Sequence, residues 1–358
     1  MKILQIIPQL GTGGAEKFTI DLSNELAKLG HDVTLVTLFD KSKMSTLEFY
    51  VDTTKVKRVS LHKKRGFDLK CFISILSLIR DEKPNVVHAH VGAIKYMILA
   101  ATVYRECKYV ATIHSEAKRE AGGCIETFVR KYLWGVKLMT PVTISVESEL
   151  SFEKFYGFKG NMIPNGCSLY KASTLPQKKY REKADFLFVH AGRLQKVKNQ
   201  ITMVKAFKRL LDEGVNARLL IMGRVEDSDV YDSIKSYFCN DIKYIGEQND
   251  CRAFMNIADA FCLSSTMEGM PITIIEAFSV GCIPIVTPVG GCINMVQNGV
   301  NGFISNGMSI NDYYETLKKF ISLNSLERKR MQQNAIESFV NIYSIEITAQ
   351  KYIELYNT

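Results

Sequence analysis

One short segment of the chain combines two carboxylates with the start of a helix. It reads Glu268-Gly269-Met270-Pro271-Ile272-Thr273-Ile274-Ile275-Glu276. Pro271 fits the first helical turn, where a missing N–H costs nothing, and the N–H groups of Met270 and Ile272 would then face an anion without any metal. Glu268 and Glu276 could accept hydrogen bonds from hydroxyls of the same ligand. Helix capping and solvation is the alternative for each glutamate.

Two cations lie close together earlier in the same half of the chain. Arg193 follows an apolar run that ends in His190-Ala191-Gly192, and Lys198 comes five residues later, at the expected start of a helix. An arginine can hold a diphosphate with two parallel hydrogen bonds, and a lysine can hold it as a point charge. Two solvated side chains on a loop are the alternative.

A glycine-rich turn near the start could approach a phosphate. Gly13 and Gly14 stand between an apolar run and a helical pattern, where backbone N–H groups can face an anion. The turn is not a dinucleotide fingerprint, because Glu16 occupies the place of the third glycine. A tight turn that binds nothing is an equal alternative.

The elements that must position these residues alternate between strands and helices. This alternation predicts an α/β fold with parallel sheets and right-handed crossovers. The pattern lapses in a Gly, Ser, Pro and Lys-rich stretch and then restarts, which predicts two tandem Rossmann-like domains facing a cleft. Expected strands are 3–7, 33–38, 86–90, 109–113, 142–145, 186–191, 217–222, 242–245, 260–263 and 283–287. Expected domain bounds are 1–166, a linker at 167–184, and 185–340.

Composition excludes several classes of protein. The 358 residues are 46% apolar and 23% charged, as in an ordinary globular chain, and no run of eighteen apolar residues could span a bilayer. Nine cysteines without paired spacing predict a reduced, cytoplasmic chain with no zinc cluster. Asp227-Ser228-Asp229 is interpreted as helix-capping acids and not as a metal site.

The positive charge is concentrated in the first half. Residues 1–172 contain 25 Lys and Arg against 17 Asp and Glu, a net +8 of the total +9. Between Lys55 and Lys70 seven cations face only Asp68, and an apolar helical pattern follows. The run is either a solvated loop or a surface that contacts anionic lipid at the membrane periphery. Nucleic acid is not expected, because no known nucleic-acid module is visible.

The ordered motifs resemble those of the retaining GT-B glycosyltransferases of family 4, of the type that builds bacterial cell-surface polysaccharides. The resemblance covers almost the whole chain. It rests on Gly13-Gly14 with Glu16, His88-Ala89-His90, Thr112-Ile113-His114, Ser145 with Glu147, Ile163-Pro164-Asn165-Gly166, Gly192-Arg193, Lys198-Asn199, Gly246, Glu268 to Glu276, Gly281-Cys282-Ile283-Pro284, Gly290-Gly291 and Asn298-Gly299 with Asn301-Gly302-Phe303. It implies that the N-terminal domain, 1–166, binds the acceptor and that the C-terminal domain, 185–340, binds the nucleotide sugar. It also implies that a C-terminal helix at 341–358 returns to the N-terminal domain.

The resemblance also implies roles for single residues. Arg193 and Lys198 would grip the donor diphosphate, with backbone N–H groups of Gly14, Met270 and Ile272. Glu268 would bind the donor sugar and Glu276 the ribose. His114 would orient or stabilise the sugar, and the base would lie near Gly246. The remaining donor-site expectations are Gly13, Gly269 and Pro271.

The implied activity is transfer of a hexose or N-acetylhexosamine from a nucleotide diphosphate sugar, expected to be a UDP-sugar, to a lipid-linked or other glycan acceptor. Neither metal nor cofactor is expected. An epimerase that acts on nucleotide sugars, a GDP-mannose-dependent transferase and a binding module without catalysis are the alternatives. Turnover of donor without acceptor would favour the epimerase, and nucleotide binding without turnover would favour the binding module.

Overall fold

The computed structural model describes residues 1–358 except 41–46, 67, 171–177 and 182–183. The chain forms two compact units, each described by itself. Unit 1 comprises Met1–Ser168 with Tyr343–Thr358, and unit 2 comprises Leu169–Ile342. Half of the expected linker, 167–184, falls outside the described residues. The expected cleft between domains stays a prediction.

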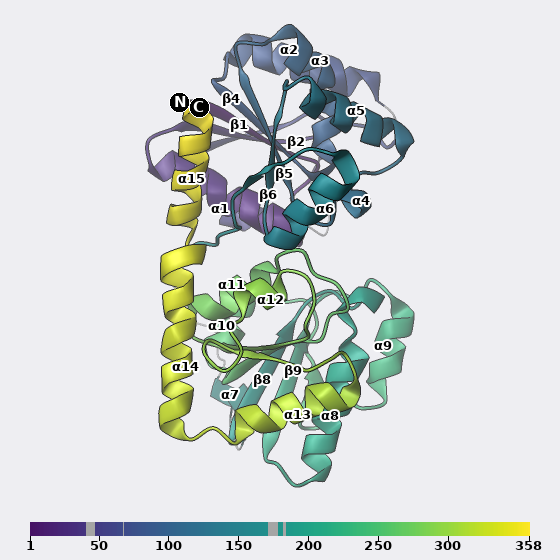
Figure 1. Cartoon of the computed structure of the whole chain (residues 1–358), viewed down its shortest axis with the longest axis vertical. Coiled ribbons are helices and arrows are strands. Elements are labelled where there is room, and N and C mark those ends of the chain that lie inside the picture. The colour runs from purple at the N-terminus through teal and green to yellow at the C-terminus, as the bar shows by residue number, and fades with distance from the viewer. Residues whose placement is uncertain (41–46, 67, 171–177, 182–183) are drawn as a thin grey trace. The chain divides into compact units, whose positions relative to one another are not determined.

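Unit 1 contains a parallel sheet of seven strands among its described residues, in the order β3-β2-β1-β4-β5-β6-β7. The strands are β1 Lys2–Ile7, β2 Asp32–Thr37, β3 Val56–Ser60, β4 Val86–His90, β5 Lys108–Ile113, β6 Thr140–Thr143 and β7 Asn161–Met162. Helices cover both faces of the sheet (Figure 1). The helices are α1 Gly14–Lys28, η1 Leu47–Tyr50, α2 Leu69–Glu82, η2 Val91–Met97, α3 Ile98–Val103, α4 Ala117–Glu120, α5 Cys124–Gly135, α6 Val146–Tyr156 and α15 Ile345–Asn357.

Unit 2 repeats this architecture with a six-stranded parallel sheet in its described part, ordered β10-β9-β8-β11-β12-β13. The strands are β8 Phe186–Ala191, β9 Ala217–Met222, β10 Ile242–Tyr244, β11 Ala260–Leu263, β12 Ile283–Val286 and β13 Phe303–Ile304. The helices are α7 Lys178–Arg181, η3 Lys196–Lys198, α8 Gln200–Asp212, α9 Ser228–Lys235, α10 Cys251–Met255, α11 Ile272–Ser279, α12 Cys292–Met295, α13 Ile310–Ile321 and α14 Ser325–Ser338. A π-helical turn, η4 Phe339–Tyr343, leads towards α15.

The central strands are buried on both faces, which explains their continuous apolar sequence. The α/β fold with two parallel sheets is therefore confirmed. The sequence pattern missed three strands. Two of them, β7 and β13, have only two residues, too few for a periodic signal. The third, β3, lies inside the basic run.

This strand corrects the interpretation of the basic run as one loop. β3 is an edge strand whose Lys57 and Arg58 are exposed, and cations on an edge strand discourage pairing with other chains. The run does not face only Asp68, because Lys57 pairs with Glu82 and Arg58 with Glu48, 3.1 Å away. Lys63 is not a surface cation, since it is only 8% exposed.

The C-terminal helix α15 belongs to unit 1, where it packs against α1 (Figure 1). Backbone hydrogen bonds between Cys167 and the neighbouring residues Tyr343 and Ile345 lead the chain into it. Gly166 is required there, because a Cβ would lie 2.5 Å from the hydroxyl oxygen of Thr348. Among the described residues no helix combines the length and the hydropathy needed to cross a bilayer.

Candidate donor and sugar sites

In unit 2 the expected site residues gather at the carboxyl ends of two neighbouring strands, β8 and β11. Arg193 and Lys198 follow β8, and Glu268 follows β11, which pairs directly with β8. The hydroxyl of Ser264 donates to the carbonyl oxygens of Lys198 and Asn199, and Thr266 N–H donates to Val197. These bonds fix the lysine-bearing turn, η3, against the end of β11.

Lys198 and Glu268 are in direct contact. The lysine Nζ lies 2.7 Å from Glu268 Oε1, and the hydroxyl of Ser265 donates to the same oxygen at 2.5 Å. Both side chains are mostly buried, with exposed fractions of 18% and 10%. The pair therefore holds the ammonium group in one place before any ligand arrives. Sequence reasoning gave the two residues separate roles and did not predict their ion pair.

Arg193 has a different environment. Its guanidinium is 44% exposed and pairs with Glu226, 3.2 Å away. Arg224 also pairs with Glu226. Burial alone would raise the pKa of Glu226, but hydrogen bonds and charges from the two arginines outweigh it and hold that pKa below its usual value. Neither Arg224 nor Glu226 was expected at this site, because no sequence signal links β9 to the end of β8.

Two glycines shape the loop that carries Glu268. A Cβ on Gly290 would overlap the carbonyl oxygen of Glu268, and one on Gly291 would overlap that of Gly269. Gly291 N–H donates to the Gly269 carbonyl at 2.9 Å, and Gly290 has a positive φ of 47°. The glycine pair therefore permits two loops to touch through their backbones.

Helix α11 begins one residue later than expected. Pro271 is its N-cap, with an extended ψ of 114°, and Ile272 is the first helical residue. The N–H of Ile272 has no partner within the helix, as in the first turn of any helix, so that turn has an anion-binding geometry. Glu276 lies in the second turn, where its charge adds to burial in raising the pKa of Cys251 on α10.

The expected base-binding end of the sheet lies at β9 and β10. Gly246 has a positive φ of 75°, and its carbonyl accepts from Gly223 N–H at 3.0 Å. Tyr244 donates its hydroxyl to the Gly223 carbonyl at 2.7 Å. A Cβ on Gly223 would in turn overlap the carbonyl oxygen of Gly192, so this glycine allows the β9 end to approach the residue before Arg193.

The buried side chain of His190 supports the loop that carries Arg193. His190 donates from Nδ1 to the Cys262 carbonyl at 2.9 Å and accepts at Nε2 from Gln200, 3.3 Å away. Gln200 also donates to the Arg193 carbonyl at 2.9 Å. Burial lowers the pKa of His190 to about 4, so the ring is neutral at pH 7.

We expect acid to destabilise the chain because His88, His90 and His190 are fully buried and burial lowers the pKa of each. Between about pH 4 and pH 6.5 the unfolded state binds more protons, so stability falls as pH falls. For His190 alone the loss at pH 5 is about 2 kcal/mol. Urea denaturation at pH 7.5 and pH 5.0 measures this loss in the free energy of unfolding. Equal urea midpoints at the two pH values would contradict the buried neutral rings.

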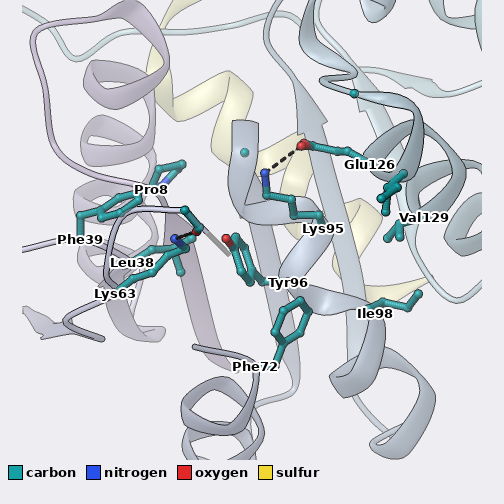
Figure 2. Close-up of a pocket in the computed structure, with 14 residues that line it drawn as sticks. Pro8, Leu38, Phe39, Lys63, Phe72, Lys95, Tyr96, Ile98, Glu126 and Val129 are labelled. Carbon is teal, nitrogen blue, oxygen red and sulfur yellow. Dashed lines mark hydrogen bonds and ion pairs between the residues drawn. The ribbon is translucent and has the colours of Figure 1, made fainter. Parts of the chain in front are cut away.

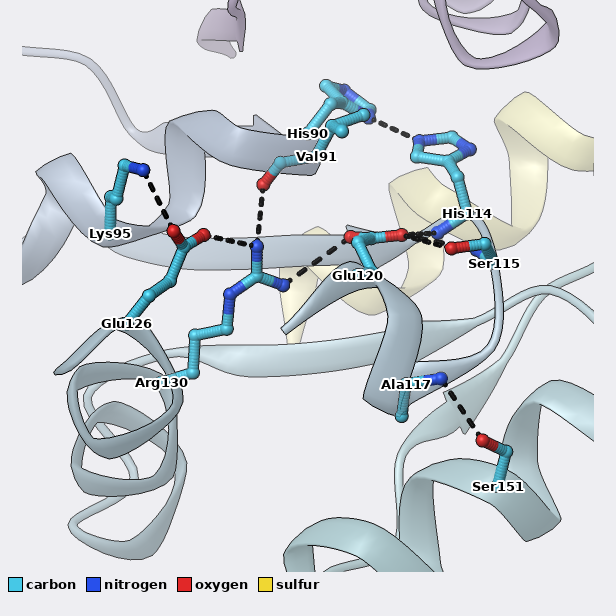
Figure 3. Close-up of polar contacts among 10 residues, drawn as sticks. All are labelled: His90, Val91, Lys95, His114, Ser115, Ala117, Glu120, Glu126, Arg130 and Ser151. Carbon is cyan, nitrogen blue, oxygen red and sulfur yellow. Dashed lines mark hydrogen bonds and ion pairs between the residues drawn. The ribbon is translucent and has the colours of Figure 1, made fainter. Parts of the chain in front are cut away.

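In unit 1, His114 follows β5 and contacts His90 at the end of β4 (Figure 3). Gln5 accepts from His90 Nε2–H at 2.7 Å, which leaves His90 Nδ1 to accept from His114 Nε2–H at 3.0 Å. His114 therefore keeps an unprotonated Nδ1. Burial lowers the pKa of His114 to about 3, which keeps the ring neutral. The sequence pointed to His114 but gave no signal for Gln5, which is distant in the chain.

The amide of Gln5 is oriented by the C-terminal helix. Its Nε2 donates to the hydroxyl of Tyr356 at 3.4 Å, and that hydroxyl lies 2.7 Å from His88 Nδ1. His88 Nε2 lies 2.7 Å from the Thr112 hydroxyl, which also contacts Tyr352 of α15. Donors and acceptors therefore match at every contact of this network, from the tyrosines of α15 to His114.

We expect Gln5→Glu to change the proton position on His114. A glutamate carboxylate at position 5 favours the imidazolium form of His90, in which both ring nitrogens are donors, so His114 Nε2 must accept. Nitrogen NMR of labelled histidines should show His114 as the Nε2–H tautomer in the wild type and as the Nδ1–H tautomer in the variant at low pH. An unchanged tautomer at every pH would contradict the arrangement.

The backbone of His114 is held by a buried ion-pair network (Figure 3). One carboxylate oxygen of Glu120 accepts from His114 N–H at 2.8 Å and from Ser115 N–H at 3.1 Å. The other oxygen pairs with Arg130, which is 1% exposed and also contacts Glu126 at 2.9 Å. Glu120 and Arg130 are thus positioning residues that the sequence did not reveal.

The glycine turn before α1 is confirmed in position, with Gly13 as the N-cap and Gly14 as the first helical residue. Its glycines admit the side chain of Glu16, since a Cβ on Gly13 would overlap Glu16 Oε2. Asp227 caps α9 by accepting from Asp229 N–H, as expected from the sequence. In the described ranges no cluster of three or more His, Cys, Asp or Glu residues has a metal-binding arrangement.

Solved structures share this fold across the whole chain. A glycosyltransferase from Rickettsia africae ESF-5 superposes with a TM-score of 0.83 at 20% identity, covering 99% of this chain and 97% of that one. HepE from Anabaena, solved in complex with UDP, gives 0.82 at 19% identity, with complete coverage of both chains. The fold is therefore that of the GT-B glycosyltransferases.

Sequence comparison defines the family. The family described as Glycosyltransferase Family 4 matches residues 12–168, and Glycosyl transferases group 1 matches residues 172–338. The chain belongs to the family 4 glycosyltransferases. It is 26% identical to the UDP-Gal:alpha-D-GlcNAc-diphosphoundecaprenol alpha-1,3-galactosyltransferase of Escherichia coli, over 99% of this chain and 95% of that protein. It is 23% identical to the capsular polysaccharide glycosyltransferase CapH of Staphylococcus aureus, over 99% and 98%.

Proposed function

We propose that this chain transfers a hexose or N-acetylhexosamine from a UDP-sugar to a lipid-linked glycan, with retention of configuration and without a metal, at the cytoplasmic face of a membrane. The observation that carries the proposal is the Lys198–Glu268 pair, held beside the first turn of α11 at the ends of β8 and β11. The relatives in Escherichia coli and Staphylococcus aureus, by their names, act in glycan biosynthesis.

The chemistry requires stabilisation of a departing diphosphate. Lys198 supplies a fixed positive charge, Arg193 can exchange its Glu226 contact for phosphate oxygens, and the first N–H groups of α11 add dipoles. Such preorganised groups stabilise charge that develops in the transition state. Glu268 keeps an oxygen, Oε2, for a sugar hydroxyl, while its Oε1 orients the lysine.

The remaining assignments are proposals of the same kind. His114, with its unprotonated Nδ1, can accept a hydrogen bond from a donor-sugar hydroxyl. Glu276 would accept from the ribose, Gly246 would leave room for the base, and Gly13 and Gly14 would face the donor phosphates. No side chain is nominated as a nucleophile, since in a retaining reaction a diphosphate oxygen can take the proton of the acceptor.

The test is an assay with UDP-galactose, UDP-N-acetylglucosamine and GDP-mannose, each with and without a polyprenyl-diphosphate glycan. Transfer only with the lipid-linked acceptor, giving an α-linked product by NMR, supports the proposal. Conversion of the donor without acceptor would favour an epimerase.

A further relative, the N-acetyl-alpha-D-glucosaminyl L-malate synthase of Bacillus anthracis, is 22% identical over 96% of this chain. L-malate is therefore the soluble acceptor to include.

We also propose that unit 1 contacts an anionic membrane through three adjoining helices, α2, α3 and α5 (Figure 1). Their exposed apolar side chains are Leu69, Ile73, Leu99, Val103, Ile125, Phe128 and Tyr132. Exposed cations Lys64 and Arg65 precede α2, and exposed Lys70 lies in its first turn. Apolar side chains beside cations are typical of surfaces that bind anionic lipid.

Neutralising Lys64, Arg65 and Lys70 together should reduce pelleting with anionic vesicles by about tenfold or more at low salt, because each surface cation contributes roughly 1 kcal/mol. Lys57 and Arg58, which are already paired with carboxylates, supply the matched control. Equal pelleting of the triple variant and the wild type would remove the membrane proposal and leave the enzyme unaffected.

A further inference from the structure

Unit 1 contains a pocket of about 700 Å³ that no donor-site residue lines (Figure 2). It lies beyond the carboxyl ends of β1 to β4, where ligands bind in parallel sheets, and its size is that of a small-molecule site. Eight of its lining side chains are apolar or aromatic: Pro8, Leu38, Phe39, Phe72, Tyr96, Ile98, Ile125 and Val129. The charged lining side chains are Lys63, Lys95 and Glu126.

The charged side chains of the pocket already have partners within the protein. Glu126 accepts from Arg130 at one oxygen and from Lys95 at the other, at 2.9 and 2.8 Å. Lys63 donates to the carbonyl oxygens of Lys64 and Gly66 at 2.6 and 2.7 Å. A sugar would need free donors and acceptors for its hydroxyls, whereas a hydrocarbon chain leaves no polar group unsatisfied. The lining therefore favours an apolar ligand.

The charge of the pocket favours an anion beside that apolar ligand. Lys63 Nζ lies over the rings of Phe39 and Tyr96, 4.7 and 5.5 Å from their centroids, and its contacts are neutral carbonyls. Within the described ranges it has no carboxylate at ion-pair distance, and the more distant Asp68, whose pKa it helps to lower, is the carboxylate with which its charge interacts. Lys95, in contrast, is neutralised by Glu126.

The pocket is continuous with the surface that we assign to the membrane. Ile125 lines the pocket and is also 83% exposed, and its neighbour Phe128, on the same helix α5, is 71% exposed. Phe72 lies on α2 next to the exposed Ile73. A lipid hydrocarbon chain that leaves a bilayer at α2 and α5 would therefore enter the pocket along apolar side chains.

We infer that this pocket binds the first part of the prenyl chain of a lipid-linked acceptor, with the attached phosphate near Lys63. The inference rests on the proposed function, because it assumes that the acceptor is lipid-linked. It extends that function by assigning lipid recognition to a site of its own in unit 1, separate from the sugar-binding residues.

The experiment measures binding of farnesyl diphosphate, a soluble prenyl diphosphate, by calorimetry in the presence of saturating UDP, which occupies any diphosphate site in unit 2. Val129→Trp on α5 and Ile98→Trp on α3 fill the pocket from two sides. Thr102→Trp, also on α3 but exposed, outside the pocket lining and not one of the apolar side chains of the membrane surface, is the matched control. Inorganic diphosphate replaces the prenyl ligand in a parallel titration.

We expect farnesyl diphosphate to bind the wild type and the control equally, and both pocket variants to bind at least about tenfold more weakly, the equivalent of excluding two methylene groups. UDP affinity and the thermal midpoint should stay the same in every variant. Unchanged prenyl binding in both pocket variants, or equal affinity for inorganic diphosphate, would overturn the inference. Loss of UDP binding in the wild type, with prenyl binding intact, would instead refute the proposed transferase.

Discussion

Replacing Lys198 with alanine is expected to lower the rate of sugar transfer at least about a hundredfold, the usual effect of removing one preorganised group from a developing anion. The ammonium group is held by Glu268 at 2.7 Å, so it is already in place for the diphosphate. Its removal also leaves the mostly buried carboxylate of Glu268 without its cation, which should weaken binding of an anionic ligand further.

The matched control is Lys196→Ala. Lys196 lies in the same turn, η3, but its side chain is 79% exposed and 3.9 Å from Asp227. We expect its replacement to leave the rate within about twofold of the wild type, because exposed ion pairs contribute little. Steady-state rates with donor and acceptor check both variants. Equal activity of Lys198→Ala and Lys196→Ala would exclude Lys198 from the site.

The second large effect is expected from Gly290→Ala, a change of one methyl group outside the charged residues. The new Cβ would overlap the carbonyl oxygen of Glu268, so the loop that carries Glu268 would have to move. A displacement of about 1 Å in a positioning loop can reduce the rate by roughly a hundredfold. We therefore expect transfer to fall by about that factor while the fold persists.

Gly299→Ala separates the steric effect from the backbone effect. Both glycines have positive φ, 47° at Gly290 and 78° at Gly299, but a Cβ on Gly299 meets no heavy atom within 4 Å. Both variants should lose about 1 to 2 kcal/mol of stability from backbone strain. Gly290→Ala should lose more than this, because its Cβ also displaces the Glu268 loop, and only this variant should lose activity. Circular dichroism melts and initial rates distinguish these effects. Full activity in Gly290→Ala would show that the Glu268 loop is not position-sensitive.

The sequence predicted the fold because parallel strands buried on both faces leave continuous apolar runs between amphipathic helices. It also predicted Arg193, Lys198 and Glu268 in one region, since residues that follow neighbouring parallel strands meet at one edge of the sheet. Their assignment to a donor site stays a prediction. The basic edge strand β3 was missed because its two consecutive cations, Lys57 and Arg58, interrupt the alternation of apolar and polar residues.

The supporting residues could not be predicted in the same way. Glu226, Gln5 and Glu120 reach their partners through contacts that depend on strand order and on side-chain direction, and single-sequence periodicity carries neither. Gly290 and Gly291 were visible as glycines, but only the neighbouring loop shows why a side chain cannot be accommodated there. The surplus charge of the basic run was misjudged because Glu48 and Glu82, which pair with it, lie outside the run.

In the proposed function, the cations of unit 2 bind the diphosphate of a nucleotide sugar without a metal. The most direct test of this binding is a calorimetric titration of UDP into the wild type and into Lys198→Ala, each with excess EDTA and again with Mg²⁺. We predict the same affinity for the wild type in both buffers and binding at least about tenfold weaker in the variant. UDP binding that requires Mg²⁺, or that is equally tight in Lys198→Ala, would contradict the account.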